Sequence, residues 1–306
     1  MIGETIEFLR RYVVMSEAEA TAVALWISLT YLEQHVDTLP ILAVTSPEKR
    51  CGKTTLLTII SKLARKALPA ANVSSAALFR AIEKLKPTLL IDEGDTFLRD
   101  NEELRGIMNA GHTREFAFVL RTNPVTLEPE RFFTWAPKAI ACIGKLPETL
   151  SDRSVEIRLQ RRTQKETAEK LRDADPETFT RLQRMAFRWS LDKGHEVKRA
   201  RPAIPQILND RASDNWYPLL AIAAVAGFDG VPNMAVRLSI ELPDQESIKV
   251  LVLKALRDLF NETGDDFLRR RDGQAVAERN DSSGSRVDGP GPTARCASRL
   301  RVQHKV

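Results

Sequence analysis

Cysteine, histidine and aromatic residues are scarce in this chain. Its 306 residues include three cysteines, four histidines and 6% Phe, Trp and Tyr. Cys51, Cys142 and Cys296 lack the paired spacing of a disulfide framework and the spacing of a metal site, and the histidines are scattered. These absences argue against a disulfide-rich secreted domain and a zinc module, and they predict a cytoplasmic protein.

Long hydrophobic runs are also missing. The most apolar helical stretch, residues 18–32, is interrupted by polar side chains, and the N-terminus lacks the basic and then apolar pattern of a signal peptide. We therefore expect a soluble protein with no membrane span. A chain of this length can bury a substantial core as one large domain or as two ordinary ones.

The excess of basic charge is confined to the C-terminal part. Residues 269–306 carry nine Lys and Arg against four Asp and Glu, which accounts for the whole formal charge of +5. Residues 1–268 hold equal numbers of acidic and basic side chains. The net charge is thus no evidence for a basic DNA-binding core.

The sequence of this tail also lacks a structural pattern. It has no aromatic residue and no helical or strand period, so it cannot bury enough apolar surface to offset the entropy of ordering. Three interpretations are open: a basic arm for nucleic acid, a disordered end without function, or a frame shift near Phe267 that replaces a folded domain. The abrupt loss of pattern after a good helix at 245–263 favours the last two.

A basic loop with a Gly-Lys-Thr end is the most informative feature that is present. An apolar run at 41–45 precedes it and an apolar helical pattern at 56–64 follows it, which is the context that a G-x-x-x-x-G-K-[ST] phosphate-binding loop requires. The candidate residues are Pro47, Glu48, Lys49, Arg50, Cys51, Gly52, Lys53, Thr54 and Thr55. Pro replaces the first glycine, so the loop entry must differ from the usual one, since Pro fixes φ and carries no N–H.

The residue types in this loop predict binding of ATP and Mg²⁺. Backbone N–H groups and the positive end of the following helix converge on an anion. Lys53 is expected to reach the β- and γ-phosphates, and the Thr54 hydroxyl to hold Mg²⁺. The alternative is a chance match on a basic loop before an ordinary helix.

A short apolar strand followed by two carboxylates supports this interpretation. Residues 88–91 suit a buried parallel strand, and Asp92 and Glu93 follow it directly. We assign Asp92 to the metal and Glu93 to activation of the attacking water. An acidic turn after a buried strand is common. The assignment of Asp92 and Glu93 therefore depends on their position about forty residues after Lys53. Asp95 is interpreted as a helix or turn cap.

Two arginines are candidates for contact with the phosphates. Arg153 precedes the last predicted strand and is a candidate arginine finger, with a structural pairing to Asp152 or a helix end as an equal alternative. Arg211 precedes an apolar helix and would lie over the nucleotide from a lid, or pair with Asp214 against a tryptophan. Arg158, Arg161 and Arg162 are interpreted as a solvated face.

The pattern along the chain predicts an α/β fold with a parallel sheet flanked by helices, a C-terminal helical lid and a disordered tail. Helices are expected at 4–14, 17–35, 56–67, 75–85 and 101–111, and strands at 41–45, 71–74, 88–92, 138–143 and 154–159. Two further strands, at 115–121 and 131–135, are expected to form a β-hairpin or a long insertion. The predicted parts are an N-terminal helical segment (1–40), an ATPase core (41–162), a helical lid region (163–268) and a basic tail (269–306).

Four segments carry a resemblance to a known group of proteins. The strings at 45–57, 90–95, 144–154 and 211–223, in this order, resemble an uncharacterised family of P-loop ATPases from prophages, plasmids and other mobile elements, often linked to primase–polymerase domains. The order is also similar to that of superfamily-three helicases and phage and poxvirus primase–helicases.

The resemblance implies an AAA+-like P-loop NTPase that assembles as a homo-oligomeric ring, a hexamer. It also implies single-stranded or forked DNA and a primase as partners, and a hairpin at 115–135 that enters the DNA channel. The usual sensor Asn is replaced by Gly144 and Lys145, and such proteins continue past Phe267 into a small folded domain.

The predicted function is therefore a Mg-ATP-dependent ATPase that acts as a DNA helicase in mobile-element replication. Arg114, Arg121 and Arg131 are the candidate DNA contacts near the hairpin. Three other functions remain open: a small-substrate phosphotransferase, a nucleotide-dependent switch or scaffold such as one in phage defence, and an idle prophage remnant.

Overall fold

The computed structural model describes residues 1–70, 73–98, 101–123, 125–239, 253, 257 and 258. The chain divides into two units, residues 1–243 and 244–306, and the helices and strands below belong to the first. The predicted tail at 269–306 and nearly all of the helix predicted at 245–263 lie outside the described residues.

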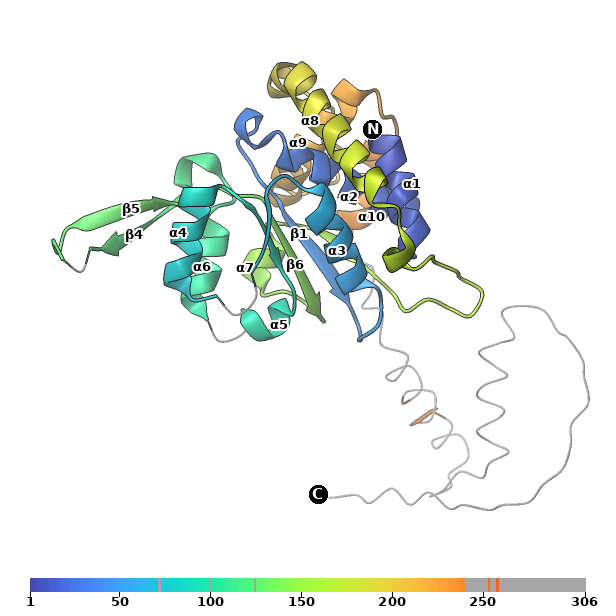
Figure 1. Ribbon diagram of the computed structural model, residues 1–306, viewed down its shortest axis with the longest axis horizontal. Helices are drawn as coiled ribbons and strands as arrows, with labels where there is room; N and C mark the ends of the chain where they lie inside the picture. The colour runs from blue at the N-terminus through green and yellow to red at the C-terminus, as the bar shows by residue number, and fades with distance from the viewer. Residues whose placement is uncertain (71–72, 99–100, 124, 240–252, 254–256, 259–306) are drawn as a thin grey trace, which may run out of the picture. The chain divides into compact units, whose positions relative to one another are not determined.

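The described residues form a five-stranded parallel sheet in the order β2-β3-β6-β1-β7 (Figure 1). The strands are β1 (Ile41–Ser46), β2 (Ala67–Pro69), β3 (Thr88–Ile91), β6 (Lys138–Ile143) and β7 (Ser154–Arg158). All residues of β1 and β3 are buried, as expected for inner strands covered on both faces. The predicted α/β class with a parallel sheet is confirmed.

One strand was predicted at the wrong position. The structure has a strand at Ala67–Pro69, ahead of the one expected at 71–74, because the preceding helix ends at Leu63 and Ala64 is already extended. Residues 71 and 72 of the expected strand lie outside the described residues, and 73 and 74 are not in a strand. β2 is a short edge strand with no fully buried residue, so its sequence carries no periodic signal. Helices are present near the other predicted positions, with ends that differ by a few residues.

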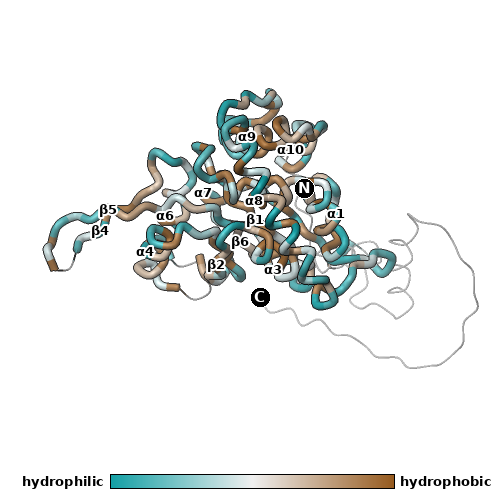
Figure 2. The backbone as a smooth tube through the Cα atoms, turned by 45° about the horizontal axis from the view of Figure 1, so that its top comes forward, coloured by the Kyte–Doolittle hydropathy of each residue, from teal (hydrophilic) through white to brown (hydrophobic). Residues whose placement is uncertain are grey.

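Helices cover both faces of the sheet, and alternate residues of β1 point to opposite faces. Leu42 and Val44 belong to one core cluster, and Ile41 and Ala43 belong to the other. The first cluster is built with α1 (Ile2–Tyr12), α2 (Glu17–Thr30), α3 (Lys53–Leu63), α8 (Pro176–Arg199), α9 (Asp210–Ala226) and α10 (Val231–Ser239). The second is built with α4 (Ser75–Leu85), α6 (Glu102–Ala110) and the short helix α7 (Glu148–Ser151). Figure 2 shows the resulting hydrophobic interior along β1 and β6.

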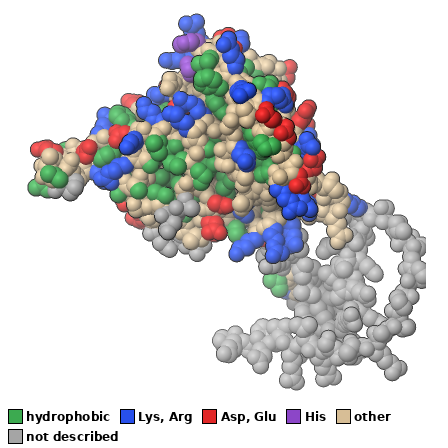
Figure 3. Space-filling view, in the orientation of Figure 1, with side chains coloured by type: hydrophobic (Ala, Val, Ile, Leu, Met, Phe, Trp, Pro, Cys, Tyr) green, Lys and Arg blue, Asp and Glu red, His purple; other side chains and the backbone are tan. Residues whose placement is uncertain are grey.

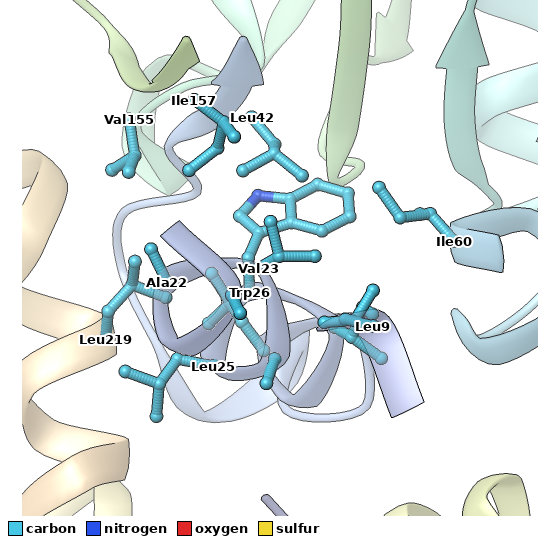
Figure 4. Close-up of a cluster of buried hydrophobic side chains, with 14 of the residues drawn as sticks. Leu9, Ala22, Val23, Leu25, Trp26, Leu42, Ile60, Val155, Ile157 and Leu219 are labelled. Carbon is cyan, nitrogen blue, oxygen red and sulfur yellow. The ribbon is translucent and has the colours of Figure 1, made fainter. Parts of the chain in front are cut away.

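The apolar helix α2 lies in the centre of the first cluster. A capping box begins it, in which the Ser16 side chain accepts from Glu19 N and the Glu19 carboxylate accepts from Ser16 N. Trp26 is fully buried and its indole N–H donates to Pro40 O at 2.9 Å. Figure 4 shows the Trp26 ring against side chains of the sheet, including Leu42. Over the described residues, no helix is both long and apolar enough to cross a membrane.

A two-stranded antiparallel hairpin, β4 (Phe118–Thr122) and β5 (Pro129–Phe133), projects from the sheet (Figure 1). Asn123 forms the turn, since its side-chain oxygen accepts from Val125 N at 2.9 Å and from Thr126 N at 3.3 Å. The predicted hairpin is confirmed, with strand ends that differ by one to three residues from those expected.

Lys138 at the start of β6 is completely buried and donates to two backbone oxygens, Gly111 O at 3.1 Å and Ala136 O at 2.8 Å. Burial lowers its pKa to about 7. The unfolded chain therefore binds more protons than the folded chain between pH 7 and the ordinary lysine pKa of about 10.4.

We expect the free energy of unfolding to rise between pH 7 and pH 9, because the Lys138 proton is lost from the folded state first. Urea denaturation at the two pH values measures this rise in the natural chain and in Lys138→Met, whose side chain does not titrate. An equal rise in both proteins would show that Lys138 is not its source.

Candidate functional site

The loop between β1 and α3 adopts a conformation that its glycine makes possible. Gly52 has φ 92° and is the residue before the first turn of α3, so the helix begins at Lys53. L-residues rarely adopt this φ, whereas glycine does so at little cost. Arg50 also has a positive φ, 68°. The first N–H groups of α3, which have no partner within the helix, therefore lie at the end of the loop.

Lys53 is held inside the loop by polar contacts. Its Nζ donates to Ser46 Oγ and lies 3.3 Å from the carbonyl oxygen of Glu48. Ser46 Oγ in turn donates to the same carbonyl at 2.6 Å. Cys51 is buried, with Sγ 3.4 Å from Glu48 O, so the loop accommodates this small side chain.

Thr54 and Asp92 meet at the carboxyl edge of the sheet. The Thr54 hydroxyl donates to Asp92 Oδ2 at 3.2 Å, and Asp92 Oδ1 accepts from Glu93 N at 2.9 Å. Both side chains are open to solvent. A hydroxyl and a carboxylate this close, with room for water ligands, fit the preference of Mg²⁺ for oxygen atoms and retained waters.

Glu93 follows at the same edge, exposed and in a left-handed conformation with φ 55°. It precedes the short helix α5 (Gly94–Phe97). Asp95 is inside α5 and accepts from Ile143 N at 3.3 Å, so it ties α5 to the end of β6 and is not the cap that the sequence suggested. A side chain at Gly94 would place Cβ 2.5 Å from Ile140 Cγ2, which explains the glycine.

Arg153 lies at the opposite edge of the sheet, which is formed by the amino ends of the strands. Its carbonyl oxygen accepts from Ile41 N at 2.9 Å, at the start of β1, whereas the phosphate-loop candidate follows the end of β1. Six strand residues span about 20 Å, which exceeds the reach of an arginine side chain. Arg153 Nη1 donates to Thr149 O at 2.8 Å, so the alternative contact with a helix end, that of α7, is present.

Arg211 lies near Arg153 and not near the loop at 47–55. Both line a hollow of about 560 Å³ together with His112. No ion pair joins Arg211 to Asp214 in the described part of the chain, and Trp216 donates to Ser239 Oγ at 2.8 Å. Arg211 therefore lies away from the loop of its own chain, because α9 starts beside the beginning of β7. Its contact with a nucleotide stays a prediction.

Asn215 holds the backbone on both sides of Arg153 and is itself bonded by His112, and neither residue was a candidate from the sequence. Asn215 Nδ2 donates to Asp152 O at 2.9 Å and to Ser154 O at 3.3 Å. Burial lowers the pKa of His112, which favours its neutral form. With Asn215 Oδ1 as acceptor, His112 Nε2 carries the proton of the 2.8 Å bond between them. The available signal was a polar Asn one turn after Arg211, directly before the apolar part of this helix.

The three arginines proposed as DNA contacts are engaged within the protein. Arg114 donates to Val36 O at 2.8 Å and lies over the Trp135 ring. Arg121 pairs with Glu103 at 2.7 Å. Arg131 lies over the ring of Phe118, 3.7 Å from its centroid.

The tip of the hairpin is apolar and acidic. Val125 is 88% exposed and Leu127 is 77% exposed, and Glu128 and Glu130 are nearby. Figure 3 shows this arm with hydrophobic and acidic side chains at its end. The described part of the tip thus offers no basic group to a phosphate backbone.

Comparison with known families gives one finding. Residues 158–281 are similar to the family described as "Protein of unknown function (DUF3631)". The matched range begins at the last residue of β7 and covers the helical region, so it contains neither the loop at 47–55 nor Asp92. Comparison with curated proteins gave no match.

Proposed function

We propose that this chain is a Mg²⁺-dependent ATPase of the P-loop, AAA+-like type. The observation that carries the proposal is the meeting of Thr54 and Asp92 at 3.2 Å beside Lys53, at one edge of a parallel sheet. The sheet order supports it, since only β6 separates the strand before the loop from the strand before the two carboxylates.

Each residue of this edge has a role in the proposed reaction. The loop amides and Lys53 bind the phosphates of ATP, and Thr54 and Asp92 would hold the metal. Bound Mg²⁺ supplies charge neutralisation on the phosphate oxygens. Glu93 orients the attacking water and accepts its proton, which requires a carboxylate that other groups do not occupy. Among the described residues, no hydrogen bond or ion pair engages the Glu93 carboxylate.

We propose further that the ATPase works as a ring. Arg153 cannot reach the loop of its own chain, but a head-to-tail contact would bring it to the nucleotide of a neighbour, and such contacts close into rings. Arginine supplied in this way stabilises the charge that develops during phosphoryl transfer. The hexamer, the primase partner and the helicase activity on single-stranded or forked DNA are proposed from the resemblance of the four motifs.

ATP turnover with and without single-stranded DNA tests this function. We expect turnover that DNA stimulates and that Lys53→Ala abolishes, whereas the exposed Lys84→Ala on α4 should behave like the natural chain. Turnover that is indifferent to DNA would favour a switch over a helicase. Absence of turnover in the natural chain would contradict the ATPase itself.

A further inference from the structure

A second hollow, of about 610 Å³, adjoins the loop, and the proposed function assigns no role to it. It is lined by Arg50 of the loop and by a segment that follows β7. The lining residues of that segment are Arg161, Arg162, Thr163, Gln164, Glu166, Thr167 and Ala168. The sequence had suggested only a solvated face for the two arginines, whereas the structure brings them to Arg50.

The order of the strands determines which end of a nucleotide faces this hollow. β1 lies between β6 and β7, and the strand before Asp92 and Glu93 lies beyond β6. A triphosphate held by the loop, with its terminal phosphate toward Asp92, therefore extends its ribose and base in the other direction. That direction leads to the end of β7, where the hollow lies.

We propose that this hollow receives the ribose and base, and that the protein binds nucleoside triphosphates with little preference among the four common bases. The inference rests on the proposed function, because the loop must first hold the phosphates. It adds the class of substrate: any nucleoside triphosphate, not ATP alone.

The exposure of the lining explains the lack of preference. Every lining residue is exposed except Ala168, which is half-buried. A site rejects a wrong base strongly when buried polar groups lose their hydrogen bonds to it. An exposed polar group that loses a hydrogen bond to a base can form one with water instead. Such groups therefore discriminate weakly among the bases.

Thr163 and Glu166, two of the polar residues in the hollow, are hydrogen-bonded to each other. The Glu166 carboxylate accepts from Thr163 N at 2.7 Å and from Thr163 Oγ1 at 3.0 Å. This local cap occupies Glu166 Oε2 and the Thr163 hydroxyl proton, so both groups are less available for hydrogen bonds to a base. Gln164 and Thr167 remain, and both are exposed.

The arginines contribute attraction that does not depend on the base. Arg50, Arg161 and Arg162 form no ion pair with any described residue. A guanidinium plane stacks on any base, because every base has a π face, and its charge attracts the triphosphate. Removing these side chains should therefore weaken the binding of all four nucleotides by a similar factor.

Competition binding tests the inference without requiring turnover. A fluorescent ATP analogue bound in the presence of Mg²⁺ is displaced by ATP, GTP, CTP or UTP. We expect the four dissociation constants to agree within about tenfold, as for sites without buried base-reading groups. A preference for ATP of about a hundredfold or more would overturn the inference and leave the proposed ATPase standing.

A double variant locates the site. Arg161→Ala/Arg162→Ala should raise all four dissociation constants by a similar factor of about ten, the scale of losing stacking on a base. The matched control, Arg184→Ala/Arg199→Ala, removes two exposed arginines of α8 and should leave the four dissociation constants unchanged. Unchanged binding in the first double variant would show that the base lies elsewhere. Failure of every nucleotide to bind would contradict the proposed function as well.

Discussion

An equal mixture of Lys53→Ala and Arg153→Ala chains should hydrolyse ATP, although neither variant should do so alone. Lys53→Ala lacks the phosphate contact but keeps Arg153, and Arg153→Ala keeps the complete loop. Because Arg153 and the loop lie at opposite edges of the sheet, the two intact halves can meet only between neighbouring chains. An arginine supplied in this way is worth about 10³ or more in kcat.

The recovered activity has an expected size. If chains mix randomly in a head-to-tail ring, about a quarter of the contacts join an intact loop to an intact arginine, so about a quarter of the natural turnover should return. The double variant Lys53→Ala/Arg153→Ala mixed with Lys53→Ala has no intact loop and should stay inactive. No recovery in mixed oligomers, verified by size-exclusion chromatography, would contradict the action of Arg153 on a neighbouring nucleotide.

Trp26→Ala should lower the free energy of unfolding by about 3–5 kcal/mol, as for large aromatic side chains removed from a packed core. Trp26 is fully buried in the first core cluster, and its loss also leaves Pro40 O without the indole donor. Urea denaturation measures the change. Since the α2 helix packs against α1, α9 and α10 as well as the sheet, a cavity here affects several elements.

The control for this prediction is an aromatic residue at the surface. Phe187 on α8 is 53% exposed, so Phe187→Ala should change the free energy of unfolding by less than about 1 kcal/mol. A loss of similar size in both variants, or a loss below about 1 kcal/mol in Trp26→Ala, would contradict the central role of Trp26 in the core.

Local sequence signals predicted the elements around the candidate loop. The apolar run before Pro47, the glycine at 52 and the helical period after Lys53 each act within a few residues, and the strand, the positive φ and the helix start were found there. The buried strand before Asp92 was found for the same reason. By contrast, the edge strand β2 has no buried residue and left no pattern from which to locate it.

The candidate site could be predicted only in part, because its residues meet through the order of the strands. The sequence assigns both Thr54 and Asp92 to the metal, and the structure brings the two side chains within 3.2 Å of each other. The position of Arg211 beside Arg153 did not follow from the sequence, since the packing of α9 beside Asp152 and Ser154 depends on a buried Asn215 whose partners are distant in sequence.

Sequence alone determined most of the local elements, the α/β class and the residue types gathered at the loop, because these follow from periodicity, glycine and short-range hydrogen bonding. Only the tertiary structure decided which edge of the sheet each charged residue occupies. Lys145 and Arg153 are eight residues apart, yet one follows the end of β6 and the other precedes the start of β7. A chain that connects parallel strands must return to the opposite edge of the sheet, so residues close in sequence are separated by the full length of a strand.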